Sequence, residues 1–286
     1  MRMILLTGAN SFIGQHIINE LKEYQFEEVS LVDKHPSSID FSKYNCVIHL
    51  AAIVHQKKTI SKDLYFRINS DLAYETALAA KKAGIQHFIF FSTIKVYGNG
   101  GYQNIIYSEL SKCNPVDDYA KSKLEAEKRL FELADDDFVV SIIRPSMVYG
   151  KGVKANMQSL INLIKLLPII PLGNINNSRS MVSISNLMTT LKAIIRMPNT
   201  DIYLACDKNQ ISTTQLVEII VSLTNKNKRI VKLPKKMQIV LRNIFPKIMI
   251  RLIGSFHVDA TLTHQKLDIV ENIIETKTAL KEIFSD

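Results

Sequence analysis

Cysteine is scarce in this sequence: Cys46, Cys113 and Cys206 are the only three among 286 residues. An odd number of scattered cysteines supports neither a disulfide framework nor a zinc site, so we expect reduced thiols, no metal centre and a cytoplasmic protein. The chain also lacks the roughly 18 uninterrupted apolar residues of a membrane span, the cleavage site of a signal peptide and any internal repeat. What remains is the composition of an ordinary globular protein, 47% hydrophobic and 22% charged.

Acidic residues are fewer than basic ones. The chain has 27 Asp and Glu and 36 Lys and Arg, which gives a formal net charge of +9. The cations are dispersed, with some enrichment over 226–251, and aromatic residues are not interleaved with them as on a base-stacking surface. We therefore expect no nucleic-acid partner, and an anionic small molecule or membrane surface instead. The apolar and basic segment 235–254 either touches an anionic membrane peripherally or forms a helix pair packed within the protein or between the subunits of a homodimer. We favour the packed pair.

Short apolar runs alternate with helical patterns over the first two hundred residues. The expected strands are 3–7, 29–33, 46–52, 87–92 and 138–144, and the expected helices are 12–24, 69–84 and 117–134. Strands separated by helices pair in parallel through right-handed crossovers. The sequence therefore predicts an α/β fold, a Rossmann-like doubly wound parallel sheet.

Strand patterns thin out beyond residue 150, although the run at 201–205 is expected to return to the sheet. We therefore expect a sheet domain of residues 1–150 together with 184–206. A smaller, mostly helical lobe would comprise 151–183 and 207–286. Open α/β sheets bind ligands outside the carboxyl ends of their strands, so this lobe is expected to cover that edge and to hold a substrate.

The stretch "TGANSFIG", residues 7–14, lies between the first expected strand and the first expected helix. Gly8 would allow a tight turn and Gly14 a close approach of helix and strand, which leaves N–H groups at the helix start free for a pyrophosphate. Ser11 occupies the place of a third glycine, and its hydroxyl could itself donate to a phosphate. An ordinary strand-to-helix turn also favours glycine, so the loop alone does not decide the matter.

An acidic residue about twenty positions further on would accept hydrogen bonds from a ribose, and Asp33 is such a residue. Lys34 follows it and could pair with a 2′-phosphate, so the choice between NAD and NADP stays open. The alternative for Asp33 is a solvated turn residue.

Tyr119 and Lys123 stand four residues apart in "YAKSK", within an expected helix, so both project from one face. A nearby ammonium favours the phenolate and lowers the pKa of a tyrosine, which would suit Tyr119 to acid–base work on a hydroxyl group and a ketone. Thr93 follows the strand "HFIFFS", at the edge where a ligand is expected, and its hydroxyl could bond to the substrate oxygen or to the tyrosine.

These motifs in this order resemble the extended short-chain dehydrogenases/reductases, in particular the nucleotide-sugar epimerase/dehydratase group, over essentially the whole chain. The matching segments are "TGANSFIG", "VIHLAA", "RINSDLAYETALAA", "FFSTIKVYG", "YAKSK", "IIRPSMVYG" and "RSMVSISNL". In that family the loop usually has a glycine where this chain has Ser11. The resemblance implies an NAD(P)-dependent enzyme.

The resemblance also implies roles for the matching positions. Thr93, Tyr119 and Lys123 would be the catalytic set, with Tyr119 as the acid and base and Lys123 holding the nicotinamide ribose. The positions expected to bind cofactor, besides Tyr119 and Lys123, are Gly8, Asn10, Ser11, Phe12, Ile13, Gly14, Asp33, Lys34, Asp40, Leu50, Ala51, Ala52, Asn69 and Pro145. We expect the segment "SSID" to be a remnant strand that brings Asp40 near the adenine.

The residues after Thr93 narrow the reaction. Dehydratases of this group need an acid pair there, whereas this chain has Ile94 and Lys95, which argues against a 4,6-dehydratase. Residues 144–182 resemble bacterial polysaccharide enzymes that reduce UDP-2-acetamido-2,6-dideoxy-4-hexuloses. This narrower resemblance implies a 4-ketoreductase that uses NAD(P)H as reductant.

Three further residues are expected to contact the UDP-sugar. Asn156 and Arg179 match positions that hold the nucleotide and diphosphate in related epimerases, and Lys95 would add positive charge. The main alternative is a 4-epimerase of UDP-GlcNAc and UDP-GalNAc, or of a polyprenyl-linked sugar, which uses the same residues and retains its NAD. A non-catalytic regulator that senses dinucleotide is the alternative from another class, and it would have no use for the tyrosine and lysine.

Overall fold

The computed structural model describes residues 3–54, 60–152, 156–224 and 228–284. Its centre is a parallel sheet of six strands in the order β10-β6-β4-β3-β1-β2. The strands are β1 (Met3–Thr7), β2 (Gln25–Val29), β3 (Cys46–His49), β4 (His87–Phe91), β6 (Val139–Pro145) and β10 (Asp201–Ala205). The chain leaves β1 toward β2 on one side and returns as β3 on the other, so the carboxyl end of β1 lies at a topological switch point. The expected Rossmann-like, doubly wound α/β fold is confirmed.

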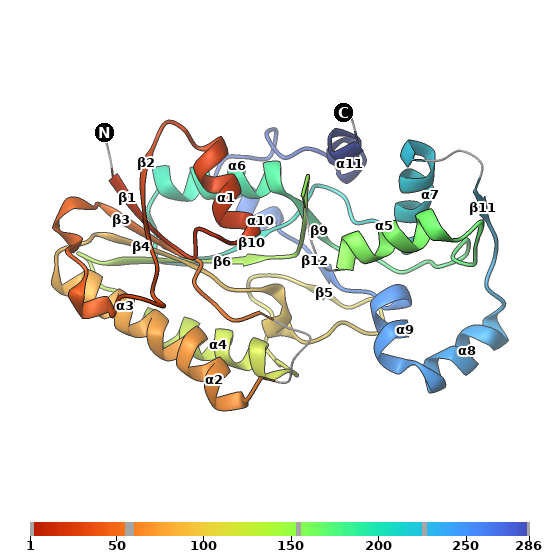
Figure 1. Cartoon of the computed structure of the whole chain (residues 1–286), viewed down its shortest axis with the longest axis horizontal. Coiled ribbons are helices and arrows are strands. Elements are labelled where there is room, and N and C mark those ends of the chain that lie inside the picture. Colours follow the sequence, from red (N-terminus) through yellow and green to blue (C-terminus); the bar gives the residue numbers. More distant parts are fainter. Residues whose placement is uncertain (1–2, 55–59, 153–155, 225–227, 285–286) are drawn as a thin grey trace.

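Helices cover both faces of the sheet (Figure 1). On one face α1 (Phe12–Glu20) packs beside α6 (Ile184–Arg196), and their apolar residues join a buried cluster with Leu6, Ile48 and Ile89. On the other face lie α2 (Lys62–Phe66), α3 (Leu72–Lys82) and α4 (Asp118–Phe131). The second buried cluster forms beneath α3 and α4 and includes Val47 and Phe90. Successive residues of each central strand therefore point into opposite cores, as their continuous apolar sequences require.

The second strand lies four residues earlier than the sequence predicts. The sequence pattern favours a strand at 29–33, but β2 is Gln25–Val29, and residues 31–33 form a turn in which the side chain of Val32 is 95% exposed. β2 is the edge strand and pairs only with β1 among the described strands, so water reaches one side of it and tolerates the two glutamates in "QFEEV". The segment 36–38, expected near a remnant strand, is the 3-10 turn η1 (Pro36–Ser38).

The carboxyl-terminal half adds a smaller body with its own buried cluster, at the right of Figure 1. Its helices are α5 (Asn156–Leu166), α7 (Thr213–Thr224), α8 (Lys235–Ile244), α9 (Pro246–Ile253) and α11 (Thr276–Phe284). Within it β8 (Ile169–Ile170) pairs with β11 (Arg229–Ile230). Two further short strand pairs lie outside the central sheet: β7 (Met147–Tyr149) with β9 (Met181–Ser183), and β5 (Ile106–Tyr107) with β12 (His257–Val258). The helix pair expected at 235–254 is present as α8 and α9. α9 buries Met249 and Ile253 in the carboxyl-terminal cluster, and Leu241 of α8 packs against the same cluster, although no residue of α8 is fully buried.

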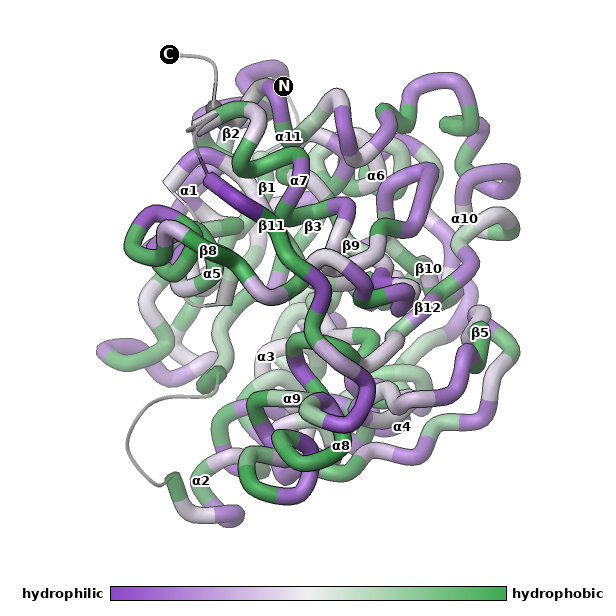
Figure 2. Tube along the Cα trace, turned by 90° about the vertical axis from the view of Figure 1, so that its right-hand side faces the viewer, coloured by the Kyte–Doolittle hydropathy of each residue, from purple (hydrophilic) through white to green (hydrophobic). Residues whose placement is uncertain are grey.

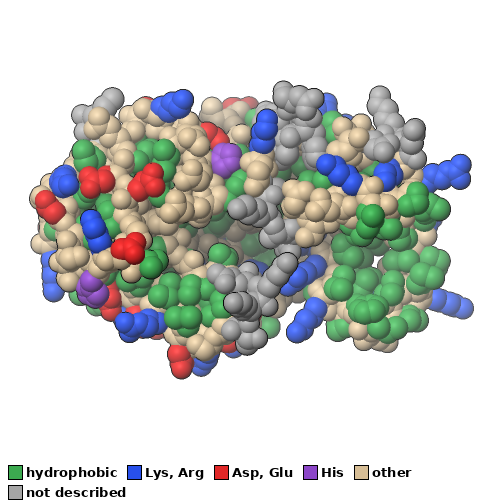
Figure 3. Space-filling model, in the orientation of Figure 1, with side chains coloured by type: hydrophobic (Ala, Val, Ile, Leu, Met, Phe, Trp, Pro, Cys, Tyr) green, Lys and Arg blue, Asp and Glu red, His purple; other side chains and the backbone are tan. Residues whose placement is uncertain are grey.

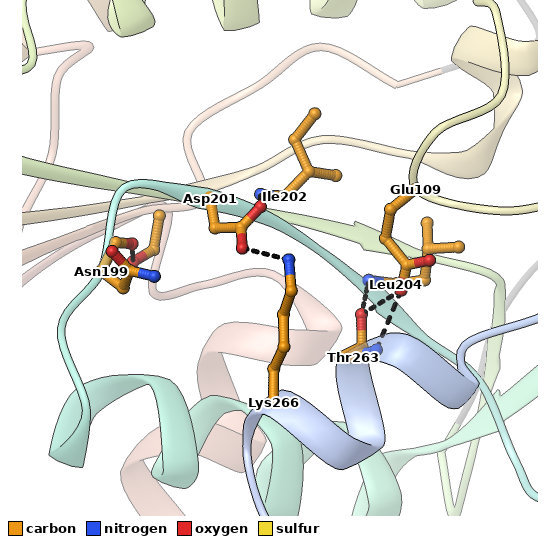
Figure 4. A network of polar contacts seen from close by, with 8 residues as sticks. Glu109, Asn199, Asp201, Ile202, Leu204, Thr263 and Lys266 are labelled. Carbon is orange, nitrogen blue, oxygen red and sulfur yellow. Dashed lines mark hydrogen bonds and ion pairs between the residues drawn. The ribbon is translucent and has the colours of Figure 1, made fainter.

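The outer edge of the sheet is closed by the helix α10 (Thr261–Lys266) (Figure 4). The Leu204 N–H donates to Thr263 Oγ1 at 2.9 Å, and Glu109 Oε1 accepts from the Thr263 backbone N–H at 3.1 Å. Lys266 Nζ lies 2.5 Å from Asp201 Oδ2. An open strand edge would expose unpaired backbone groups, and here a side chain of the carboxyl-terminal segment satisfies one of them.

No helix in the described ranges is both long enough and apolar enough to cross a membrane. Within the same residues no group of three or more His, Cys, Asp or Glu side chains could hold a metal ion.

Candidate active site

The two glycines of the 7–14 loop stand where no side chain would fit. Gly8 follows β1 with a φ of +71°, and a Cβ there would lie 2.7 Å from the backbone nitrogen of Ala51. At Gly14, inside α1, a Cβ would lie 2.5 Å from the carbonyl oxygen of Ala9. The close approach of α1 to the end of β1 therefore depends on both glycines, as the sequence predicts.

Ser11 has a structural reason to replace the third glycine. Its φ is −74°, which any residue adopts, and its Oγ accepts a hydrogen bond from the Gly14 N–H at 3.1 Å as the N-cap of α1. Within the described part of the chain nothing accepts from the N–H groups of Phe12 and Ile13, which are half-buried at the helix start, while Asn10 and Ser11 are exposed. Two free N–H groups at a helix N-terminus, beside a turn with no side chain, fit a pyrophosphate.

The segment after β3 forms the opposite wall of this loop. Leu50 N–H donates to the Thr7 carbonyl at 3.1 Å, and Ala51 N–H donates to the Thr7 hydroxyl at 3.3 Å, with Ala52 half-buried next to them. Asn69 fixes the next residues: its Oδ1 accepts from Ile53 N–H at 2.8 Å, and its Nδ2 donates to Ile53 O at 3.0 Å.

Asn69 lies in the π-helical turn η3 (Arg67–Asp71), and it also reaches helix α4. Its Nδ2 lies 3.0 Å from Ser122 Oγ, and Ser122 in turn donates to the Tyr119 carbonyl at 2.8 Å. Such one-turn π bulges are frequent at functional sites. Asn69 thus links the loop after β3 to the helix that carries Tyr119 and Lys123. The sequence does not predict this linking role, because nothing in the "YAKSK" motif indicates that Ser122 contacts Asn69.

The residues expected at the adenosine end are exposed. Asp33 and Lys34 lie in the turn beyond β2 and not on the strand itself. The Asp40 carboxylate caps the 3-10 turn η2 (Phe41–Lys43) and accepts from the Ser42 hydroxyl at 2.6 Å and from the Ser42 N–H at 3.1 Å, contacts that lower the pKa of Asp40. The strand expected to bring Asp40 to the adenine is absent, because 36–43 forms two short turns.

Thr93, Tyr119 and Lys123 come together at the carboxyl end of β4. Thr93 lies two residues after the strand, within hydrogen-bonding reach of the Tyr119 phenol. Lys123 is one helical turn beyond Tyr119, only 2% exposed, and its Nζ donates to the Phe91 carbonyl at 2.8 Å. Pro145 ends the neighbouring strand β6 at the same edge and is buried.

The expected effect of Lys123 on the tyrosine is wrong for the protein as it stands. Burial, reinforced by the negative charge of Asp117, raises the pKa of Tyr119 above its ordinary value, while the bond with Thr93 lowers it in part. The ammonium of Lys123 is engaged with β4, where it also lies 4.4 Å from the centre of the Phe90 ring. Burial lowers the pKa of Lys123 itself to about 7. At neutral pH the Tyr119 phenol therefore carries its proton.

The three residues expected to bind the UDP-sugar have different surroundings. Lys95 Nζ lies 2.9 Å from Asp117 Oδ2 and 5.8 Å from the centre of the Tyr119 ring, so it belongs to the mouth of this site. Arg179 Nη1 donates to the carbonyl oxygens of Arg251 and Gly254, at the end of α9. Asn156 begins α5, and its side chain lies outside the described part of the structure.

A buried ion pair behind this site is not anticipated by the sequence analysis. Glu127, two turns after Tyr119 on α4, pairs with Arg144 of β6, and Ser92 Oγ donates to the same carboxylate. Arg144 Nη1 also donates to the Tyr97 hydroxyl at 2.7 Å. The signal that could have revealed it is the spacing 119, 123 and 127, which places Glu127 on the same helix face as the two expected catalytic residues.

Comparison with known proteins agrees with this geometry. Residues 4–205 match the model of the NAD dependent epimerase/dehydratase family. A UDP-glucose 4-epimerase of Vibrio cholerae is 32% identical to the chain and covers 93% of it, with 90% of that protein covered in return. A UDP-2-acetamido-2,6-beta-L-arabino-hexul-4-ose reductase of Pseudomonas aeruginosa is 26% identical and covers 79% of the chain and 58% of that protein.

A solved structure supports the fold. The dTDP-4-dehydrorhamnose reductase of Bacillus anthracis, in complex with NADP, has a TM-score of 0.77 to this chain at 20% identity, with 99% of both chains covered. At that identity the likeness concerns the fold alone.

The broader resemblance seen in the sequence is confirmed, whereas the narrower one to 4-hexulose reductases is not, since the reductase relative is less similar than the epimerase over a smaller share of the chain. The matched family spans every strand of the central sheet, the glycine loop and the Thr93, Tyr119 and Lys123 set. The chain belongs to the NAD dependent epimerase/dehydratase family.

Proposed function

We propose that this enzyme uses NAD or NADP to interconvert a hydroxyl group and a ketone at C4 of a UDP-sugar. One observation carries the proposal: the Tyr119 phenol lies beside the Thr93 hydroxyl, one helical turn from Lys123, at the strand edge that also holds the Gly8 turn. A hydroxyl next to an acid–base group can hold a substrate oxygen while its proton moves.

The chain's own residues then have separate tasks. A nicotinamide bound at this edge supplies or accepts the hydride. Tyr119 gives its phenolic proton to the substrate's C4 oxygen, or takes it back, while the Thr93 hydroxyl holds that oxygen in place. Lys123, whose ammonium lies on the Phe91 carbonyl, would hold the ribose hydroxyls of the cofactor. The N–H groups of Phe12 and Ile13 would receive the pyrophosphate.

For the net reaction we propose reduction of a UDP-2-acetamido-2,6-dideoxy-4-hexulose by NAD(P)H. The Tyr119 phenol, which lies beside the Thr93 hydroxyl, can donate its proton to the C4 oxygen of a ketone, as this reduction requires. The Pseudomonas aeruginosa reductase is a relative with the corresponding activity.

A second candidate is a UDP-sugar 4-epimerase, favoured by the 32% identity to the Vibrio cholerae enzyme over 93% of this chain. The same residues would then remove hydrogen from C4 and return it to the opposite face. Such an enzyme needs no external reductant, because its cofactor is regenerated within each cycle.

One experiment separates the two. The purified protein is mixed with the UDP-4-keto-6-deoxy-GlcNAc and either NADH or NADPH, and nicotinamide absorbance is followed while the product is identified by NMR. We expect one nicotinamide oxidised for each 4-hydroxy sugar formed, and no reaction of UDP-GlcNAc or UDP-GalNAc without added cofactor. Interconversion of those two finished sugars without reductant would establish the epimerase instead. The variant Tyr119→Phe serves as the matched inactive control in both assays.

A further inference from the structure

The whole net charge of the chain comes from one stretch of forty residues. Residues 219–258 contain nine Lys and Arg and no Asp or Glu, while the other 27 cations are balanced by the 27 acidic residues elsewhere. This stretch includes α8 and α9, along which hydrophilic and hydrophobic residues alternate (Figure 2). A long acid-free segment of this kind attracts anionic surfaces.

The two helices also expose apolar side chains. Six residues are between 50% and 60% exposed, a large fraction for such side chains: Met237, Ile239, Val240, Ile244, Phe245 and Ile248. In Figure 3 hydrophobic side chains gather over the end of the molecule where α8 and α9 lie, with Lys and Arg around them, while the acidic side chains visible on that face lie at the other end. Exposed apolar groups concentrated in one patch mark an interaction surface.

The patch belongs to an anchored part of the fold. Met249 and Ile253 hold α9 on the carboxyl-terminal cluster, and Leu241 packs against the same cluster from α8. The Arg242 guanidinium lies 3.8 Å from the centre of the Tyr102 ring. Tyr102 is 46% exposed and lines a surface pocket with Ile105, so the apolar face continues from α8 onto this loop.

We propose that α8 and α9 form a docking surface for an anionic lipid bilayer. An amphipathic helix with cations on its flanks lies in the membrane interface, its apolar face among the acyl chains and its cations among the headgroups. A second copy of this chain fits the face poorly, because two acid-free surfaces would repel each other. Nucleic acid fits it poorly as well, because a phosphate backbone would not bury the exposed apolar side chains of Met237, Val240, Ile244 and Ile248.

The absence of tryptophan from the chain allows a direct test. Phe245→Trp places a single indole between α8 and α9, and Leu110→Trp places one at a residue 87% exposed outside them. Each full-length protein is mixed with vesicles of phosphatidylglycerol and phosphatidylcholine in equal parts, or of phosphatidylcholine alone, and binding is measured by sedimentation. We expect binding to the anionic vesicles only, with a blue shift of the indole emission for the first protein and none for the second.

Two sets of variants separate insertion from simple attraction of charge. The triple change Met237→Gln, Ile244→Gln and Ile248→Gln and the double change Lys235→Glu and Lys236→Glu should each weaken vesicle binding about tenfold or more. The matched controls Val32→Gln with Leu110→Gln, and Lys22→Glu with Lys82→Glu, change exposed residues elsewhere and should bind as the parent does. All of these positions are exposed, and circular dichroism confirms folding.

Three results would overturn the proposal. The first is failure to bind anionic vesicles. The second is binding that the triple glutamine change leaves intact, which means that charge alone attracts the protein. The third is a dimer in light scattering that the triple change converts to a monomer, which would make this face an interface between copies. None of these results depends on which sugar the enzyme converts, so the proposed function stands or falls separately.

Discussion

Arg144 and Glu127 form a two-point ion pair in the interior of the protein. Arg144 Nε lies 3.0 Å from Glu127 Oε1, and Arg144 Nη2 lies 2.5 Å from Glu127 Oε2, with the two residues 3% and 2% exposed. The pair joins helix α4, which carries Tyr119 and Lys123, to strand β6. The position of the expected catalytic helix over the sheet therefore depends on a charged contact that water does not reach.

Removal of one partner of this ion pair should lower the stability of the folded protein. Glu127→Gln leaves a buried guanidinium without its counter-charge, and we expect the free energy of unfolding to fall by about 3–5 kcal/mol. Urea denaturation followed by circular dichroism measures the loss. Glu23→Gln, which breaks a pair with Lys192 in which both side chains are 36% exposed, is the control and should cost about 0–1 kcal/mol. Equal losses for the two variants would contradict the structural role assigned to the buried pair.

Tyr119→Phe should leave the fold and the dinucleotide affinity unchanged and reduce turnover by about two to four orders of magnitude. The reason is that the hydroxyl beside Thr93 is the proton donor to the C4 oxygen. Steady-state kinetics and cofactor titration provide the two measurements. Tyr74→Phe, a hydroxyl removed from helix α3, is the matched control. Turnover within a few-fold of the parent would remove Tyr119 from the mechanism.

The turn at Gly8 can be tested by two alanine substitutions. Gly84 has a φ of +82°, and nothing lies within 4 Å of the place that a Cβ would take there, so Gly84→Ala should cost about 1–2 kcal/mol from backbone strain alone. Gly8→Ala adds a collision with the Ala51 backbone to a similar strain, so its loss should be clearly larger. Thermal unfolding compares the two. Any folded Gly8→Ala protein should also bind NAD(H) weakly, whereas Gly84→Ala should bind it normally.

Ser11 should act as a helix cap more than as a phosphate ligand. Ser11→Ala removes the acceptor of the Gly14 N–H bond and should lower the free energy of unfolding by about 1 kcal/mol, whereas Ser11→Gly should cost only a few tenths. Both variants should remain active. Ser11→Leu should weaken cofactor binding in isothermal titration because its bulk would crowd the pyrophosphate. Normal binding by the leucine variant would mean that this loop does not cradle the cofactor.

Two buried histidines predict how stability depends on pH. Burial lowers the pKa of His87 to about 4 and that of His49 to about 3, so the folded protein does not protonate them until far below the ordinary value of 6.5. The unfolded chain takes up these protons below about pH 6.5, so the contribution of the two neutral histidines to stability is full above that pH and is lost as pH drops toward 4. His49→Phe, at a site stacked between Phe88 and Phe90, should make this fall shallower. Urea midpoints between pH 7.5 and 4.5 give the slope, and an unchanged slope would contradict the assignment.

The sequence predicts the central strands well where they are buried on both faces. Residues 3–7 and 87–91 are apolar except for Thr7 and His87, and both are strands at the expected positions, the second one residue shorter than predicted. It misplaces the edge strand β2 because "QFEEV" is half polar and looks like a turn, whereas the apolar "SLV" that follows resembles a strand and is a turn. Apolar content marks a strand only when neighbours cover both of its faces.

The sequence also predicts only part of the expected site, namely the part that local motifs define. The glycine loop and the Thr93, Tyr119 and Lys123 set follow from local motifs, and the parallel topology brings them to one edge. The contacts of Arg179 with the end of α9, and of Asn69 with Ile53 and Ser122, join residues 16 to 75 positions apart. No local pattern contains that information, because it arises only when the helices pack.

The pairing of β12 with β5 bears on how enzymes of this build diversify. Thr263 and the strand 257–258 lie far along the chain, yet they complete contacts made by Glu109 and the strand 106–107. A recombination that exchanged the final eighty residues for those of a relative would separate these partners and leave the buried Glu109 carboxylate facing a foreign helix. An exchanged segment would therefore keep the fold intact only if it brought its own partners for Glu109 and for the strand 106–107.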